Sequence, residues 1–302
     1  MSKRRRARVS ATAGAVLLLW ACLAGVAACQ RRPAASSPAE ARAAGAAVTE
    51  LVEKVRAKDF TATLRARELG PGAAAGVTPL LSDLDPTVRQ LALLCLLEMP
   101  APDALDIAFG AVSDDDPQVR AVALRGVGQL ATRNHATRVV EALRNHPEPV
   151  ARKELALIVG GMGGRESLGP LRAACDAHSD PETQRGCLVA RAWLEDAEAQ
   201  QEFGRQVVAS RGGERIELLG YADRIRARWL LPSLGALLDD TGPARWIGAD
   251  GRPGPETLRV CDVAVNLIAA ISGHRFGFVV GPRVNYAPSE IAEVSRFVRS
   301  NP

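Results

Sequence analysis

The feature that most constrains the fold is a short motif, an acidic residue followed by proline, that recurs at a fixed interval. Its four copies are Asp85-Pro86, Asp116-Pro117, Glu148-Pro149 and Asp180-Pro181. Successive prolines stand 31, 32 and 32 residues apart. Proline suits the first turn of a helix because its missing N–H has no partner there, and the preceding acid can cap that turn. A regular interval of this length predicts stacked copies of one structural unit.

The residues after each proline carry an apolar stripe of helical period. Offsets 0, 3, 4, 7, 8 and 11 from Val88 fall on apolar side chains, and the same offsets from Val119, Ala151 and Val260 repeat the pattern with Glu154 as its polar exception. A strand would alternate with period 2, so these segments are predicted helices and no β-strand is expected. A shorter apolar segment precedes each helix, at residues 77–84, 104–113, 136–145, 167–178 and 228–239.

This unit of two helices resembles the HEAT repeat, and in particular the HEAT-like repeats of the phycobilisome-lyase type. The run Leu69-Gly70-Pro71-Gly72-Ala73-Ala74-Ala75 resembles the usual lead-in to such a repeat. The resemblance covers residues 46–275 and implies an all-α solenoid of about six to seven helical hairpins. The unit at 198–226 is degenerate because Asp223 and Arg224 interrupt its stripe, and a final helix at 289–299 would cap the open end of the stack.

The N-terminal segment has the pattern of an export signal. Residues 1–28 hold five basic residues and no acid, and an apolar run over 13–28 is short for a membrane-spanning helix. The run ends in Val26-Ala27-Ala28-Cys29, which resembles the lipobox of bacterial lipoproteins. The resemblance implies that residues 1–28 are removed and that Cys29 carries the lipid, with palmitate among its acyl chains. The alternative is an ordinary signal peptide cut at another bond.

The next segment is predicted to be a disordered tether. Residues 29–44 are rich in Ala, Pro and Ser and lack large apolar side chains, so they cannot bury a face. The repeat domain would then occupy residues 45–302. In bacterial lipoproteins, Asp after the lipidated cysteine favours retention in the inner membrane. Gln30 stands there instead, which favours a domain anchored to the outer membrane of the cell envelope and facing the periplasm.

The net charge gives no case for nucleic-acid binding. The full chain has 38 Lys and Arg against 34 Asp and Glu, a net charge of +4. Without the five basic residues of 1–28, 33 basic and 34 acidic residues remain, a net charge of −1. The excess of positive charge therefore belongs to the predicted signal peptide.

No pattern in the chain predicts a catalytic, cofactor-binding or metal site. The four histidines, which we expect at turns or helix ends on the surface, are His135, His146, His178 and His274. None has an i, i+4 histidine partner, and no Cys-x-x-Cys occurs. Asp114-Asp115-Asp116 lacks the glycine and distal glutamate of an EF-hand loop, so a helix cap is favoured over a cation site.

Two sets of residues have both a structural and a functional interpretation. Arg89, Arg120 and Arg152 occupy one repeat position, where they could form a hydrogen-bonding ladder between repeats, which we favour, or a cationic ladder for anions. Cys175 and Cys187 lie at similar distances from the turn near Asp180, so a disulfide and two buried thiols both remain open.

An insertion at residues 241–255 is the best candidate for a feature added to the fold. Its glycine and proline content excludes a regular helix, and it contains Trp246 beside Arg245. A tryptophan with an arginine is typical of a binding hot spot. The alternative, which we favour slightly, is that Trp246 folds back on the last repeat.

Together these patterns predict a non-catalytic binding or scaffolding module, held at the membrane through a lipid anchor. An α-solenoid offers an extended concave surface, so the expected partner is a protein or peptide whose identity the sequence does not give. The alternatives are an enzyme or accessory factor of the HEAT-like lyase type, and an envelope carbohydrate binder. Aromatic residues make up only 4% of the chain, which disfavours a carbohydrate site based on stacking.

Overall fold

The computed structural model describes residues 38–99, 101–245, 258–282 and 284–301, which are mostly helical. The α-helices are α1 (Pro38–Arg56), α2 (Ala62–Leu69), α3 (Ala74–Val77), α4 (Pro86–Glu98), α5 (Ala104–Ala111), α6 (Pro117–Leu130), α7 (Ala136–Asn145), α8 (Pro149–Met162), α9 (Leu168–Cys175), α10 (Pro181–Trp193), α11 (Ala197–Ala209), α12 (Gly212–Ile225), α13 (Leu231–Gly235), α14 (Val260–Ser272) and α15 (Pro288–Ser300). Short 3-10 turns are η1 (Pro71–Ala73), η2 (Thr78–Ser82), η3 (Arg133–His135), η4 (Arg165–Ser167) and η5 (Arg228–Leu230).

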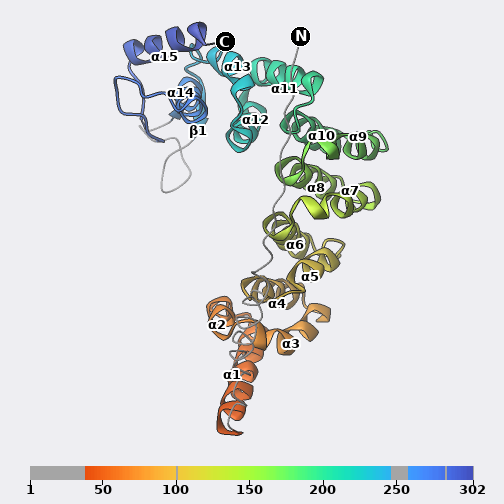
Figure 1. Ribbon diagram of the computed structural model, residues 1–302. Helices are drawn as coiled ribbons and strands as arrows, with labels where there is room; N and C mark the ends of the chain where they lie inside the picture. The colour runs from red at the N-terminus through yellow and green to blue at the C-terminus, as the bar shows by residue number, and fades with distance from the viewer. Residues whose placement is uncertain (1–37, 100, 246–257, 283, 302) are drawn as a thin grey trace, which may run out of the picture. The chain divides into compact units, whose positions relative to one another are not determined.

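The helices pair into hairpins at the predicted places. Helix α5 packs against α6, α7 against α8 and α9 against α10, and the second helices α4, α6, α8 and α10 contact one another in that order (Figure 1). Residues 48–302 are thus an all-α solenoid, as the period predicts. Each hairpin buries its stripe against the next hairpin as well as within itself.

The predicted acidic caps form at three of the four prolines. Carboxylate oxygens of Asp85, Asp116 and Asp180 accept hydrogen bonds from N–H groups of the first helical turn. The prediction is wrong at Glu148, whose side chain makes no cap bond. Glutamate is not among the preferred N-cap residues because its longer side chain does not fold back as readily onto the N2 and N3 amides. The N–H of Glu148 instead donates to Nδ1 of His146, at 3.1 Å.

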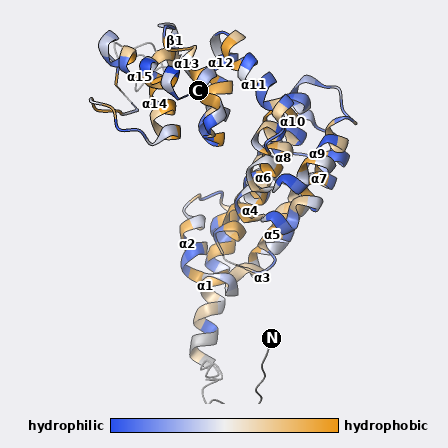
Figure 2. Ribbon diagram, turned by 45° about the horizontal axis from the view of Figure 1, so that its top comes forward, coloured by the Kyte–Doolittle hydropathy of each residue, from blue (hydrophilic) through white to orange (hydrophobic). Residues whose placement is uncertain are grey.

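The hydrophobic core extends along the stack as three neighbouring clusters of buried side chains. Figure 2 shows apolar residues in successive hairpins from α4 to α14. Helices α8 and α10 approach each other closely at two glycines. A Cβ on Gly186 would lie 2.7 Å from the carbonyl oxygen of Lys153, and one on Gly160 would lie 2.8 Å from Cα of Ala190. The small residues therefore set the spacing of this pair of helices.

The start of the described chain corrects one prediction. Helix α1 begins at Pro38, so residues 38–44, expected in the disordered tether, are helical. Alanine has the highest helix propensity, and this segment is mainly alanine behind a proline suited to a first turn. By contacts the chain divides into residues 1–47 and 48–302, and within the second unit Leu51 and Val55 of α1 are fully buried.

The degenerate unit forms two regular helices, α11 and α12. Phe203, Val207 and Leu218 are buried in it, while Asp223 and Arg224 are exposed at the end of α12. The interruption in the stripe therefore falls on the surface and does not break the helix.

The prediction that no strand occurs is wrong at the insertion. Strands β1 (Pro243–Arg245) and β2 (Leu258–Arg259) form a two-stranded antiparallel ribbon that joins the two ends of the inserted segment. Two backbone bonds continue the pairing, from Val260 N–H to Gly242 O and from Cys261 N–H to Asp240 O, each at 2.9 Å. The ribbon leaves α13 and α14 in contact, so it is an addition to the helical stack. The terminal helix α15 then packs on α13 and α14 and buries Val294 and Val298, as expected of a capping helix.

Candidate functional site

The recurring arginines lie at the turns between first and second helices. Nη1 of Arg120 donates to the carbonyl oxygens of Asp114 and Asp115, at 2.8 and 2.9 Å. Arg89 and Arg152 make the same type of bond to the carbonyls six and five residues before them. Each arginine therefore holds the turn that precedes its own helix.

Two of these arginines also reach the following hairpin. Nε and Nη2 of Arg89 donate to both carboxylate oxygens of Asp114, at 2.9 and 2.8 Å. Arg152 donates through Nε to Oγ1 of Thr183 and through Nη2 to Asp180, at 2.9 and 2.6 Å. Both guanidinium groups are mostly buried, and their nitrogens are occupied by protein acceptors. They therefore act between repeats and offer little to a bound anion.

The fourth repeat has glutamine at the arginine position. Nε2 of Gln184 donates to the carbonyl oxygens of Cys175 and His178, at 3.0 and 2.5 Å. An amide can replace the part of the arginine that holds its own turn, but it is too short to reach the next hairpin.

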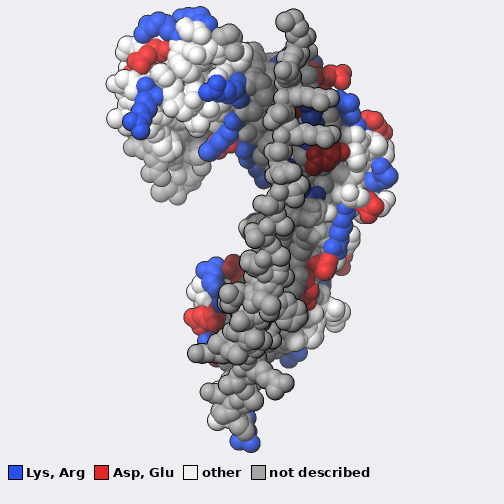
Figure 3. Space-filling model, viewed as in Figure 1, with Lys and Arg blue, Asp and Glu red and all other residues white. Residues whose placement is uncertain are grey.

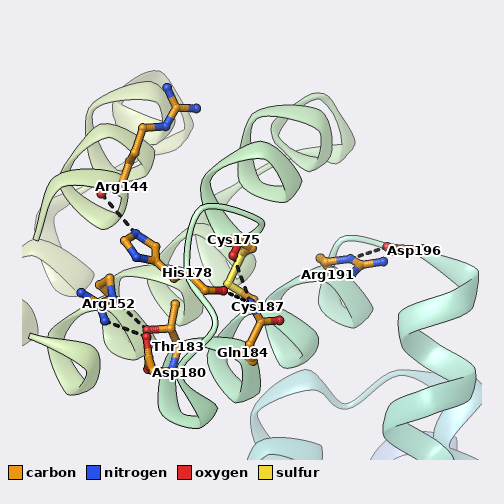
Figure 4. The surroundings of a disulfide bond; sticks show 10 residues. All are labelled: Arg144, Arg152, Cys175, His178, Asp180, Thr183, Gln184, Cys187, Arg191 and Asp196. Atoms are coloured by element: carbon orange, nitrogen blue, oxygen red, sulfur yellow. Dashed lines mark hydrogen bonds and ion pairs between the residues drawn. A yellow bond between two sulfur atoms is a disulfide. The ribbon is translucent and has the colours of Figure 1, made fainter.

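The same hairpin contains a disulfide between Cys175 of α9 and Cys187 of α10, with Cα atoms 6.0 Å apart. Figure 4 shows the bond beside Gln184, with Arg152, Asp180 and Thr183 on the neighbouring turn. Both sulfur-bearing residues are buried. The hairpin is therefore closed covalently and by the Gln184 amide.

Two further cysteines, Cys95 and Cys261, are free and buried. Burial raises the pKa of the Cys95 thiol to about 12 and also raises that of Cys261. Neither is a thiolate near neutral pH, which is the form that nucleophilic catalysis requires.

The predicted surface position of the histidines is wrong for His146, which is 5% exposed. Its Nε2 lies 3.0 Å from the carbonyl oxygen of Val112 in the preceding hairpin, while Nδ1 accepts from Glu148 N–H. This arrangement requires a neutral ring with the proton on Nε2. His178 makes the corresponding bond to the carbonyl oxygen of Arg144, at 3.1 Å. His146 and His178 thus link successive hairpins.

Asp114-Asp115-Asp116 is occupied by contacts of the fold. Asp116 caps α6, and Asp114 accepts from the Asp116 N–H and pairs with Arg89. Burial raises the pKa of Asp114, but the hydrogen bonds from Arg89 and from that N–H outweigh it and leave the pKa lowered. Within the described ranges, no group of three or more His, Cys, Asp and Glu residues could hold a metal ion.

A network of part-buried charged residues joins three second helices. Lys153 of α8 contacts Glu182 of α10 at 2.5 Å and Glu217 of α12 at 3.8 Å. Arg185 of α10 contacts Glu217 at 2.6 Å and Glu214 at 3.5 Å. Burial raises the pKa of Glu217, but hydrogen bonds from the Tyr221 hydroxyl and from Arg185 lower it by more than burial raises it. The pKa is therefore lowered overall, and this carboxyl stays ionised.

The sequence contains a signal for this network that is visible only when the repeats are aligned with one another. Lys153, Arg185 and Glu217 stand 32 residues apart, each one place after the position of the recurring arginine. Two basic residues and one acid at the same repeat position, on adjacent helices, are suited to pair with one another.

A groove of about 670 Å³ lies beside this network, between α6 and α8. Its lining residues are Pro117, Arg120, Ala121, Leu124, Arg125, Gly128 and Gln129 of α6, Glu148, Val150, Ala151 and Glu154 at α8, and Arg224 of α12. Val150 is 57% exposed, which is unusual for a large apolar residue beside an intact core. The groove is thus a surface where a partner could bury apolar area without disturbing the repeats.

A second cavity, of about 750 Å³, lies between α12 and α14. Ile216, Leu219 and Val263 line it together with Asn266 and the ion pair of Asp223 with Arg226. The ribbon also borders this cavity, since Ala244 and Leu258 line it. Trp246 itself lies outside the described residues, and the backbone of Arg245 ends β1.

Cys29 and the predicted signal peptide also lie outside the described residues. Within residues 38–99, 101–245, 258–282 and 284–301, no helix has both the length and the hydropathy to cross a bilayer.

Comparison with known proteins supports the repeat architecture. A family model of HEAT repeats matches residues 74–143, which include α4 to α6 and most of α7. Among solved structures, that of human deoxyhypusine hydroxylase in complex with glycerol is 16% identical and has a TM-score of 0.34, covering 87% of this chain and 98% of that one. No curated protein matches the chain. The matched segment contains HEAT repeats, and the helical hairpins and their period in the rest of the described chain are consistent with a HEAT-like repeat protein.

Proposed function

We propose that this chain is a protein-binding scaffold of the bacterial cell envelope, held at the membrane through lipid on Cys29. HEAT repeats suggest a protein-interaction or scaffold module. The observation that carries the proposal is the groove between α6 and α8, with exposed Val150 on one side and Ala121 and Leu124 on the other. Binding would occur by burial of apolar surface and pairing of charges along second helices.

The anchor rests on the sequence. The basic residues, the apolar run and the small residues before Cys29 are the features that lipoprotein processing uses. Helix α1, which begins at Pro38, leaves residues 30–37 between the lipid and the first helix. On this proposal the repeat domain lies close to the outer membrane and faces the periplasm.

The anchor is tested by metabolic labelling with an alkyne analogue of palmitate. The wild-type chain should be labelled and should enter the detergent phase, while Cys29→Ser should do neither. Cys95→Ser, which removes another thiol, should leave labelling unchanged. Equal labelling of the Cys29→Ser chain would refute lipidation at this residue.

The scaffold function is tested by co-purification from detergent-solubilised envelopes after cross-linking. We expect one protein to be recovered in stoichiometric amount and to be lost in Val150→Glu. Glutamate at the second position of a helix is favourable to the helix dipole, so α8 should stay folded. The matched control is Leu84→Glu, which changes a side chain that is 98% exposed and lies outside the groove.

Three outcomes would refute the scaffold proposal. One is equal recovery of every protein with wild type and Val150→Glu. The others are a bound tetrapyrrole and turnover of a small substrate, which would favour the lyase-type alternative.

A further inference from the structure

The charge network on the second helices ends at α8. The residue of α6 that corresponds to Lys153, Arg185 and Glu217 is Ala121, 32 residues before Lys153. A methyl group cannot continue a chain of ion pairs. The charge network therefore does not continue across the groove between α6 and α8.

Charged residues around this groove have no ion-pair partners among the described residues. Arg125 of α6 and Arg224 of α12 are exposed, and Glu148 and Glu154 stand on the α8 side. None of the four appears in a salt bridge, although most charged residues elsewhere on α8, α10 and α12 do. The groove therefore presents both signs of charge, and each is free to meet a partner.

The contacts of α12 with its neighbours show how charges on these second helices pair with those of an adjacent helix. Glu214 and Glu217 lie one turn apart on α12, and they pair with Arg185 of α10 and Lys153 of α8. Buried Leu218 and Leu219 follow them on the same helix and belong to the cluster that includes Leu157 of α8. On this surface, charges about one turn apart on one helix therefore pair with charges on two neighbouring helices beside an apolar contact.

We propose that the groove between α6 and α8 receives a helix of a partner protein that presents an acidic and a basic side chain on either side of an apolar residue. The acidic side chain pairs with Arg125 and Arg224, the basic one pairs with Glu148 and Glu154, and the apolar residue covers Val150. This inference rests on the proposed scaffold function and adds the chemistry of the partner.

The mixed charge of the groove disfavours a polyanion as the occupant. A nucleic acid or an anionic membrane would meet Glu148 and Glu154 as well as the arginines, and the like charges would repel. A wholly acidic or wholly basic helix has the same difficulty on one side of the groove. Only a segment with both signs satisfies all four residues.

The test uses three labelled helical peptides of equal length with the same leucine stripe. Their polar positions carry both signs, only acids, or only bases. Fluorescence anisotropy measures binding to the full-length protein in detergent. We expect the mixed-charge peptide to bind about tenfold more tightly than either other peptide, the factor expected for two partly exposed ion pairs. Equal affinity of the three peptides would overturn the inference.

Variants locate the binding. The double variant Arg125→Glu, Arg224→Glu should bind the mixed-charge peptide about tenfold more weakly than wild type, since two attractive contacts become repulsive. The matched control is Arg296→Glu with Arg299→Glu, which makes the same change of net charge on α15 and should leave the affinity within about twofold. An equal loss in both double variants would show long-range attraction only and would overturn the inference.

The result can be separated from that of the proposed function. If the envelope partner is captured and lost in Val150→Glu, but the charge variants bind it and the peptides unchanged, then the scaffold stands and this inference fails. If the mixed-charge peptide binds through Arg125 and Arg224 but no envelope partner depends on Val150, the groove chemistry stands and the scaffold proposal fails.

Discussion

The close approach of α8 and α10 allows a prediction in which the same substitution has opposite effects at two sites. Gly186 lies inside α10 and Gly220 inside α12, so alanine at either removes the same entropic disadvantage of glycine in a helix. That gain is ~1 kcal/mol. The two sites differ in the space around the added methyl group.

At Gly220 a Cβ would meet nothing within 4 Å, so the gain of ~1 kcal/mol should appear in full. At Gly186 it would lie 2.7 Å from the carbonyl oxygen and 2.8 Å from Cα of Lys153. These are backbone atoms, so α8 and α10 must move apart. Overpacking of this kind costs up to ~3 kcal/mol, which leaves Gly186→Ala less stable by ~2 kcal/mol.

Urea unfolding followed by far-UV circular dichroism measures both variants against wild type. The midpoint should rise for Gly220→Ala and fall for Gly186→Ala, with ~3 kcal/mol between the two. If Gly186→Ala were as stable as Gly220→Ala, the interhelical contact at Lys153 would not constrain the packing, and the reasoning would be wrong.

Three further predictions concern the turns. Arg152→Met should lower the free energy of unfolding by ~3–5 kcal/mol because it leaves buried partners unsatisfied, whereas Arg120→Met should cost ~1–3 kcal/mol; equal losses in urea titrations would contradict this. The pKa of Asp180 is lowered to about 2, because hydrogen bonds from the Thr183 N–H and from Arg152 outweigh the effect of burial. Its carboxylate therefore stabilises the fold above an unfolded pKa of ~3.9, and this contribution should be lost as the pH falls from there to ~2, less steeply in Arg152→Met. Reduction of the Cys175–Cys187 disulfide should cost ~3 kcal/mol. Of the four cysteines after residue 29, a thiol reagent should label two in the unfolded, unreduced chain and four after reduction, and four before reduction would exclude the bond.

The helices could be predicted because their information is local and repeated. The acid and proline at each turn, and the apolar stripe that follows, specify one hairpin without reference to the rest of the chain. Each hairpin then packs only against the hairpins next to it in the sequence, so the architecture follows from the period. The start of α1 at Pro38 was missed because an alanine-rich segment without a large apolar face fits both a helix and a tether.

The candidate site was less predictable because it depends on residues from separate hairpins. The groove exists because Ala121 stands where later repeats have Lys153 and Arg185, a comparison that requires the repeats to be aligned at one position. The burial of His146 depends on the carbonyl of Val112 in the preceding hairpin. No pattern around the histidine itself contains that acceptor.

The charged residues on the visible surface are of both signs and interspersed (Figure 3), so surface charge alone does not mark a binding face. The binding face is indicated by the contrast between paired and unpaired charges. Which charges are paired can be seen only in the structure.

The arginine position has a consequence for how unfolding spreads along the stack. Arg89 and Arg152 each bond to two successive hairpins, but Arg120 bonds, among the described residues, only to the carbonyls of its own turn. At the junction between the hairpins of α6 and α8, the described residues therefore have apolar packing and the His146 imidazole but no bridge from the recurring arginine. The first helices of the same two hairpins are joined by the exposed ion pair of Arg138 with Asp106. In a repeat protein the coupling between neighbours decides how far a local opening propagates. An exposed ion pair couples neighbours less strongly than the mostly buried bridges of Arg89 and Arg152. The hairpins on the two sides of this junction should therefore exchange amide hydrogens more independently than those joined by Arg89 or Arg152.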